Sequence, residues 1–134
     1  MYTVIVADDE EEIRRGIVRK VRWEELGFRV VGEAENGAEA LEMVEKLEPD
    51  LLLTDIRMPF LSGIELSRSV REVLPTVQIA FLSGFDDFSY AQQAIQYNIV
   101  SYMLKPISAA ELEEELRNIK AVMDRKFEAV SYTH

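Results

Sequence analysis

Residues 4–10 read Val4-Ile5-Val6-Ala7-Asp8-Asp9-Glu10, a short apolar run that ends in three consecutive acids. A run that is apolar at every position is typical of a strand at the centre of a parallel sheet covered on both faces. A second run of the same kind, Leu51-Leu52-Leu53-Thr54, also ends at an acid, Asp55. These two runs predict central strands whose carboxyl ends carry carboxylates.

Strand-like and helix-like segments alternate along the rest of the chain. Strands are predicted over residues 4–7, 28–33, 51–54, 77–82 and 101–104, and helices over 11–21, 38–47, 63–74 and 86–97. A last helix is predicted to begin at Ser108 and Glu111, which have the spacing of a capping box, and its apolar stripe runs to Phe127. The alternation predicts the α/β class, with a doubly wound five-stranded parallel sheet, flavodoxin-like (β/α)5, in strand order 2-1-3-4-5.

The length of 134 residues fits one domain, which we place at residues 1–125, with 126–134 as an extension of the last helix and the start of a linker. The chain has no cysteine, no apolar run of membrane-spanning length and no signal-peptide pattern at its start. These features predict a cytoplasmic protein that does not bind membranes. The formal net charge of -10 disfavours direct nucleic-acid binding by this domain.

Chemically active residues follow four of the predicted strands. They are Asp8, Asp9 and Glu10 after the first, Asp55 after the third, Ser83 after the fourth and Lys105 after the fifth. In this fold ligands bind beyond the carboxyl ends of the strands, where the strand order reverses. Clustered carboxylates repel one another unless a cation offsets their charge, and Mg²⁺ prefers such oxygen ligands. The set therefore predicts a phosphoryl-transfer site with an aspartate nucleophile.

Each of these residues also has a structural explanation. The acids of residues 8–10 suit a helix start, and Asp55 suits a turn before Met58-Pro59. Ser83 could be an ordinary turn residue and Lys105 an ordinary surface lysine. Their common placement at the same edge of one sheet favours a functional site.

The chain resembles the receiver domains of two-component response regulators over about residues 2–122. The resemblance rests on residues 4–10 and on three further strings: Thr54-Asp55-Ile56-Arg57-Met58-Pro59, Leu82-Ser83-Gly84 and Tyr102-Met103-Leu104-Lys105-Pro106. It implies a signalling switch rather than an enzyme with turnover. Asp55 would accept a phosphoryl group from a sensor histidine kinase, with Mg²⁺ as cofactor.

The resemblance also implies a role for each matching residue. Mg²⁺ would be held by Asp8, Asp9, Asp55 and the backbone carbonyl of Arg57. Lys105 and Ser83 would bind the phosphoryl group, Tyr102 would be the switch aromatic, and the bond before Pro106 would be cis. The signal would pass to the face formed by the helix over 86–97, the strand over 101–104 and the last helix, which could also form a homodimer.

Two segments, residues 23–28 and 83–91, resemble receivers that precede an AraC-type helix-turn-helix domain. They imply transcription regulation through a C-terminal DNA-binding output domain. Two positions depart from the family pattern. Asn98 stands where glycine is common, and Asn tolerates a left-handed conformation. Phe60-Leu61 follows Met58-Pro59 where glycine is common, which leaves the shape of that loop open.

Other classes fit the sequence less well. A flavodoxin needs a Ser/Thr/Gly-rich phosphate loop after its first strand, and here that loop is acidic. A haloacid-dehalogenase-type phosphatase needs an Asp-x-Asp pair and a cap domain, and a P-loop NTPase needs a Gly-rich Lys-Ser/Thr motif. The alternative that stays open is a pseudo-receiver, which would act as an unphosphorylated protein-interaction module.

Overall fold

The computed structural model describes residues 1–84, 89, 92–93 and 95–132. Its centre is a five-stranded parallel sheet in the order β2-β1-β3-β4-β5. The strands are β1 (Tyr2–Ala7), β2 (Phe28–Ala34), β3 (Leu51–Thr54), β4 (Gln78–Ser83) and β5 (Ser101–Leu104). The predicted fold class and strand order are confirmed.

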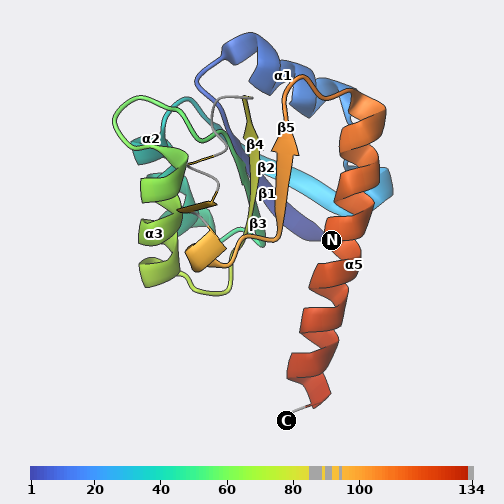
Figure 1. Ribbon diagram of the computed structural model, residues 1–134. Coiled ribbons are helices and arrows are strands. Elements are labelled where there is room, and N and C mark those ends of the chain that lie inside the picture. Colours follow the sequence, from blue (N-terminus) through green and yellow to red (C-terminus); the bar gives the residue numbers. More distant parts are fainter. Residues whose placement is uncertain (85–88, 90–91, 94, 133–134) are drawn as a thin grey trace.

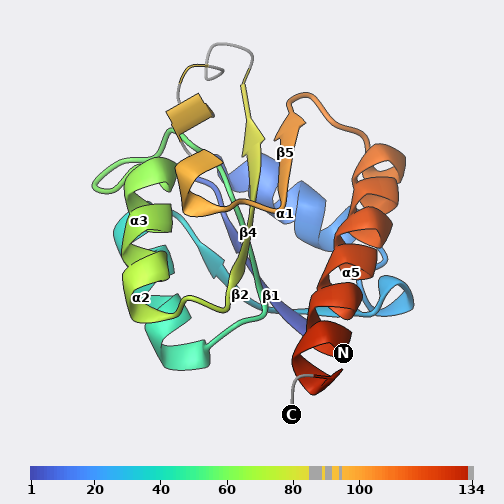
Figure 2. The same cartoon turned by 60° about the horizontal axis from the view of Figure 1, so that its bottom comes forward.

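The helices cover both faces of this sheet (Figures 1 and 2). They are α1 (Glu11–Lys20), α2 (Gly37–Leu47), α3 (Gly63–Val73) and α5 (Ala109–Tyr132), with the short 3-10 helices η1 (Glu24–Leu26) and η3 (Ile95–Tyr97). α2 and α3 lie on one face, and α1 and α5 lie on the other. The helix predicted over 86–97 falls mostly outside the described residues, and its last three residues form η3.

Alternate residues of each central strand supply two separate cores, because successive side chains of a strand point to opposite faces. On β1, Val4 and Val6 join the core under α1 and α5, whereas Ile5 and Ala7 join the core under α2 and α3. The strand β3 divides its leucines between the two cores in the same way. This explains why these strands read as continuous apolar runs.

The starts of two strands differ from the sequence prediction for local reasons. β1 begins two residues earlier, where the backbone N–H of Tyr2 donates to the carbonyl of Gly27 at 3.0 Å. β4 begins at Gln78 because the N–H of Val77 turns back to the carbonyl of Leu74 at 3.2 Å. The predicted capping box at the start of α5 is present, with the N–H of Glu111 3.1 Å from Ser108 Oγ.

An arginine on α3 fixes the turns around β4 and η3. The Arg71 guanidinium donates to the carbonyls of Tyr97 at 2.7 Å, Asn98 at 3.3 Å and Pro75 at 3.1 Å, and also to that of Val77. Asn98 has φ 59, the left-handed conformation that the sequence analysis considered for it. The arginine therefore holds together segments that come before β4 and before β5.

A charged clamp joins α5 to the turn after α1. Glu113 is buried and accepts three hydrogen bonds from Arg22: from the backbone N–H at 2.9 Å, from Nη2 at 2.9 Å and from Nε at 3.2 Å. These bonds hold the pKa of Glu113 at about 2, below its usual 4.5. The clamp stabilises the packing of α5 on the sheet.

None of the helices in the described part of the chain combines the length and the apolar character that a membrane crossing requires.

Candidate functional site

Backbone hydrogen bonds hold the predicted site residues at one edge of the sheet. The N–H of Asp8 donates to Ala34 at 3.0 Å, and the N–H of Asp55 donates to Ala7 at 2.9 Å. The N–H of Lys105 donates to the carbonyl of Ser83 at 2.7 Å. These bonds continue the strand ladders by one residue, so the side chains lie at fixed positions just beyond the strands.

The ammonium group of Lys105 lies between two buried carboxylates. Its Nζ is 2.9 Å from Asp8 Oδ2 and 3.0 Å from Asp55 Oδ2, and it is 3.7 Å from Glu10 Oε1. Asp8 and Asp55 are 2% and 6% exposed, so little water reaches these bonds. One cation therefore offsets the charge of two buried acids from two different strands.

The pKa values of Asp55 and Lys105 are both shifted by this arrangement of charges. Burial raises the pKa of Asp55, and the nearby Asp8 charge raises it further, although the hydrogen bond from Lys105 opposes both. The pKa of Asp55 therefore lies above its ordinary value. Burial lowers the pKa of Lys105, but its hydrogen bonds to Asp8 and Asp55 outweigh burial, so its pKa is raised. Lys105 stays cationic at neutral pH.

The acids form a cluster that suits a hard divalent cation. Asp8, Asp9, Glu10 and Asp55 each offer a carboxylate oxygen, and these oxygens lie within 4.8 Å of one another. Asp9 and Glu10 are exposed, so the cluster opens to solvent on one side. An all-oxygen donor set that is partly open to water fits Mg²⁺, which usually keeps several water ligands. Glu10 is part of this cluster, although the sequence analysis did not include it among the metal ligands.

A hollow next to the cluster connects Asp9 with the loop between β3 and α3. It is lined by Asp9, Ile56, Arg57, Met58, Ser62 and Glu65. Arg57 thus lies beside the acids, as a backbone ligand at this position requires. Within the cluster, Asp55 Oδ1 accepts the N–H of Ile56 at 2.7 Å, which fixes the rotation of the carboxylate.

The two predicted switch residues are bonded to each other. Ser83 is fully buried at the end of β4, and its hydroxyl lies 2.7 Å from the hydroxyl of Tyr102 on β5. The Lys105–Pro106 peptide bond is cis. The hydroxyl pair links the strand-end edge to the outer strand of the sheet.

Two residues of the site could not be assigned a role from the sequence. Arg14 is 4% exposed and donates from Nη1 to the carbonyl of Asp8 at 2.8 Å and from Nε to Glu33 at 3.2 Å. Its signal is a lone cation at helical spacing among apolar residues of the first helix. Gly63 packs against the backbone of Asp55, since a Cβ at residue 63 would lie 2.2 Å from the carbonyl oxygen of Asp55.

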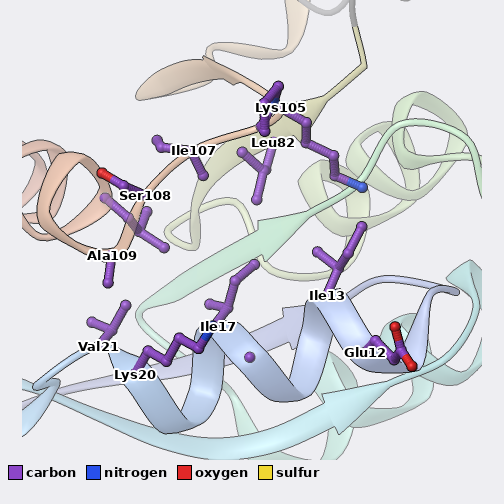
Figure 3. Close-up of a pocket in the computed structure, with 13 residues that line it drawn as sticks. Glu12, Ile13, Ile17, Lys20, Val21, Leu82, Lys105, Ile107, Ser108 and Ala109 are labelled. Atoms are coloured by element: carbon purple, nitrogen blue, oxygen red, sulfur yellow. The ribbon is translucent and has the colours of Figure 1, made fainter.

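An apolar groove borders Lys105 on the side of α1 (Figure 3). The side chains of Ile13 and Ile17 on α1, and of Val21 just after it, face Leu82 and Ile107 across the groove. Lys105 extends along its edge. The site therefore has an apolar surface directly beside its cation.

The chain is similar to known proteins over most of its length. A family model described as the response regulator receiver domain matches residues 4–117. The transcriptional regulatory protein YesN of Bacillus subtilis is 39% identical over 126 residues, which cover 94% of this chain and 34% of that protein. The transcriptional regulatory protein HptR of Staphylococcus aureus is 34% identical over 94% of this chain and 50% of its own length. The chain thus spans about a third to a half of these relatives.

Solved structures agree in fold. The receiver domain of AraT, a response regulator from Geobacillus stearothermophilus, is 38% identical and superimposes with a TM-score of 0.89 over 93% of this chain and 97% of that one. A two-component transcriptional regulator AraC from Clostridium phytofermentans is 30% identical, with a TM-score of 0.84 over 93% of this chain and 97% of that one.

Proposed function

We propose a function on one premise: this chain belongs to the response regulator receiver domain family. Its place is in phosphorylation-dependent signalling, and we propose that Asp55 is the residue that becomes phosphorylated. The observation that carries the proposal is the Lys105 ammonium, which lies within 3.0 Å of both Asp8 and Asp55. A buried carboxylate beside a fixed cation suits a nucleophile whose product carries still more negative charge.

The donor is the phosphohistidine of a sensor histidine kinase. A carboxylate oxygen of Asp55 forms a bond to phosphorus while the phosphorus–nitrogen bond breaks, and the imidazole leaves with the bonding electron pair. Lys105 offsets charge on the phosphoryl oxygens, and the N–H of Ile56 holds the carboxylate in place. Mg²⁺, held by Asp8, Asp9, Asp55 and the backbone carbonyl of Arg57, would supply further positive charge at those oxygens.

The groove in Figure 3 gives the kinase a surface on which to dock. It is lined mainly by aliphatic side chains from α1 and from the segment that follows Lys105. A partner seated there contacts the chain beside the cation that will bind the transferred group. Apolar contact suits this acidic chain, because the chain's net charge of -10 gives no electrostatic attraction to a phosphorylated partner.

Phosphorylation changes the shape of a more distant surface. The phosphoryl group interacts more favourably with the arrangement in which Ser83 and Lys105 bind it than with the unphosphorylated arrangement. This difference in interaction free energy shifts the equilibrium between the two arrangements. The Ser83–Tyr102 bond carries the change to β5, and from there to α5 and the segment between β4 and β5. That surface then regulates a C-terminal DNA-binding domain of the AraC type or forms a homodimer. The full protein would act in the cytoplasm.

The test is labelling by acetyl phosphate in the presence of Mg²⁺, followed on phosphate-affinity gels. Wild type is expected to be labelled, and Asp55→Asn is expected to lose labelling. Asp50→Asn, which changes an acid at the opposite end of the same strand, is the matched control and keeps it. Chelation of the metal should also prevent labelling. Undiminished labelling of Asp55→Asn contradicts the assignment, and an unlabelled wild type favours the pseudo-receiver.

A further inference from the structure

Phe60, in the loop between β3 and α3, combines two unfavourable features. Its side chain is 86% exposed, and its backbone has φ 70, a conformation that residues other than glycine rarely adopt. The N–H of Leu61 donates to the carbonyl of Pro59 at 2.8 Å, which closes a γ-turn around Phe60. With positive φ this is the rare, strained form of the turn. Glycine would remove both features, so the phenylalanine calls for an explanation outside folding.

Contacts on both sides of Phe60 hold the backbone of the loop in place. On either side of it, Met58 and Leu61 pack against the core under α2 and α3. The N–H of Gly63 donates to the carbonyl of Ile56 at 2.7 Å, and Leu61 lies tightly against Gly37 at the start of α2. Because Met58 and Leu61 are held inward, the side chain of Phe60 points to solvent, where it is 86% exposed. An aromatic side chain has only two rotatable bonds, so it loses little conformational freedom when a partner covers it.

The position of the loop indicates which partner this is. Phe60 lies five residues after Asp55, and other residues of the same loop line the hollow beside Asp9. Figure 1 places the loop at the end of the sheet to which the strand arrowheads point. A protein that brings phosphohistidine to Asp55 must cover this end. The groove beside Lys105 is lined by α1, and the loop that carries Phe60 leads into α3 on the other face of the sheet, so apolar side chains lie on both sides of the strand-end edge.

We propose that Phe60 is an anchor for the phosphohistidine-bearing protein donor and sets which donors this chain accepts. The inference rests on the proposed function of Asp55. The net charge of -10 repels an approaching phosphorylated protein, so an uncharged contact at the rim helps to hold it. Buried aromatic anchors of this kind account for much of the affinity at protein interfaces. Phe60 takes no part in bond making at Asp55.

The experiment compares two kinds of phosphoryl donor. Purified, autophosphorylated cytoplasmic cores of several sensor histidine kinases are screened, and the fastest donor to wild type is retained. Acetyl phosphate with Mg²⁺ is the small donor that needs no docking. Phe60→Gly is expected to slow transfer from the kinase about tenfold or more, as expected for loss of an interface anchor. Labelling by acetyl phosphate stays at the wild-type rate.

Three controls separate docking from loop shape. Phe60→Tyr keeps the aromatic ring and should keep kinase transfer. Phe127→Ala removes another exposed aromatic, 68% exposed on α5, and should leave both donors unaffected. The thermal midpoint of Phe60→Gly should be at or above that of wild type, since glycine adopts positive φ without strain.

The failures can be told apart. If Phe60→Gly takes the phosphoryl group from the kinase as fast as wild type, or loses both donors equally, the inference is wrong while Asp55 keeps its role. Wild type that accepts from acetyl phosphate but from none of the kinase cores also counts against the inference. If neither donor labels wild type at Asp55, the proposed function itself fails.

Discussion

Asp55 and Glu113 are both buried carboxylates bonded to a cation, yet their pKa values shift in opposite directions. Glu113 accepts three hydrogen bonds from Arg22, whose guanidinium also pairs with the exposed Glu25 at 3.4 Å, and its pKa falls to about 2. Burial raises the pKa of Asp55, which must share Lys105 with Asp8. The two regions differ in the balance between burial and hydrogen bonding: the hydrogen bonds from Arg22 outweigh burial at Glu113, whereas burial outweighs the hydrogen bond from Lys105 at Asp55. The clamp is electrostatically satisfied and holds α5, whereas the strand-end site keeps excess negative charge that only an additional cation can offset.

Replacing each of the two cations, Lys105 and Arg22, by methionine is expected to have the largest effect. Lys105→Met should slow labelling of Asp55 by acetyl phosphate about 100-fold, because a fixed cation at the developing charge is lost. Arg22→Met should lower the thermal midpoint, because the buried Glu113 loses both guanidinium hydrogen bonds and keeps only the one from the backbone N–H of residue 22. The measurements are labelling rate and thermal unfolding for both variants. Equal slowing of labelling in both would break the proposed division between a chemical and a structural cluster.

Two glycines provide the next test. Gly63→Ala should destabilise the fold by about 1–3 kcal/mol, because the new Cβ would press on the backbone of Asp55 and Ile56. Gly16→Ala, in α1 with open space around its Cβ position, should instead stabilise it by about 0.5–1 kcal/mol. Urea unfolding of both variants measures the difference. Close packing of Gly63 against Asp55 would be contradicted if Gly63→Ala unfolded at the same urea concentration as wild type.

The smallest effect is expected in the acid dependence of stability. The pKa of Glu113 is about 2 in the folded chain and about 4.5 when unfolded, so its contribution is complete above the higher value and is lost as pH falls towards the lower one. Glu113→Gln should flatten the fall of unfolding free energy over that interval. Glu72→Gln, in an exposed pair with Arg68, should not. If the unfolding free energies of wild type and Glu113→Gln fall in parallel over this pH interval, the clamp does not contribute to stability as proposed.

The sequence was sufficient for the sheet because two apolar runs, residues 4–7 and 51–54, are buried on both faces and leave little choice of fold. It also located Asp8, Asp55, Ser83 and Lys105 at one edge, since parallel strands end on the same side. Pairs of residues that meet only in the folded chain could not be predicted from the sequence. Arg22 and Glu113 are 91 residues apart, and nothing local marks either as a partner of the other.

Backbone strain in the loop before α3 could not be predicted from the sequence either. The sequence analysis left the loop at Phe60 open, because a non-glycine residue gives no sign that neighbouring contacts will force it to positive φ. Arg14 was overlooked since its neighbours on the first helix indicate an apolar face, and only the fold brings the carbonyl of Asp8 to it. Both residues depend on contacts between elements rather than on a pattern within one.

The Ser83–Tyr102 hydrogen bond limits which of the two hydroxyls can act as the donor. A serine hydroxyl has one hydrogen to donate and two lone pairs to accept with. If Ser83 gives its hydrogen to a phosphoryl oxygen, it cannot also give it to Tyr102, but it can still accept the phenolic hydrogen. The 2.7 Å contact then reverses its polarity instead of breaking. Tyr102 would follow Ser83 as a donor, so the outer strand would sense the new charge through the direction of one O–H bond.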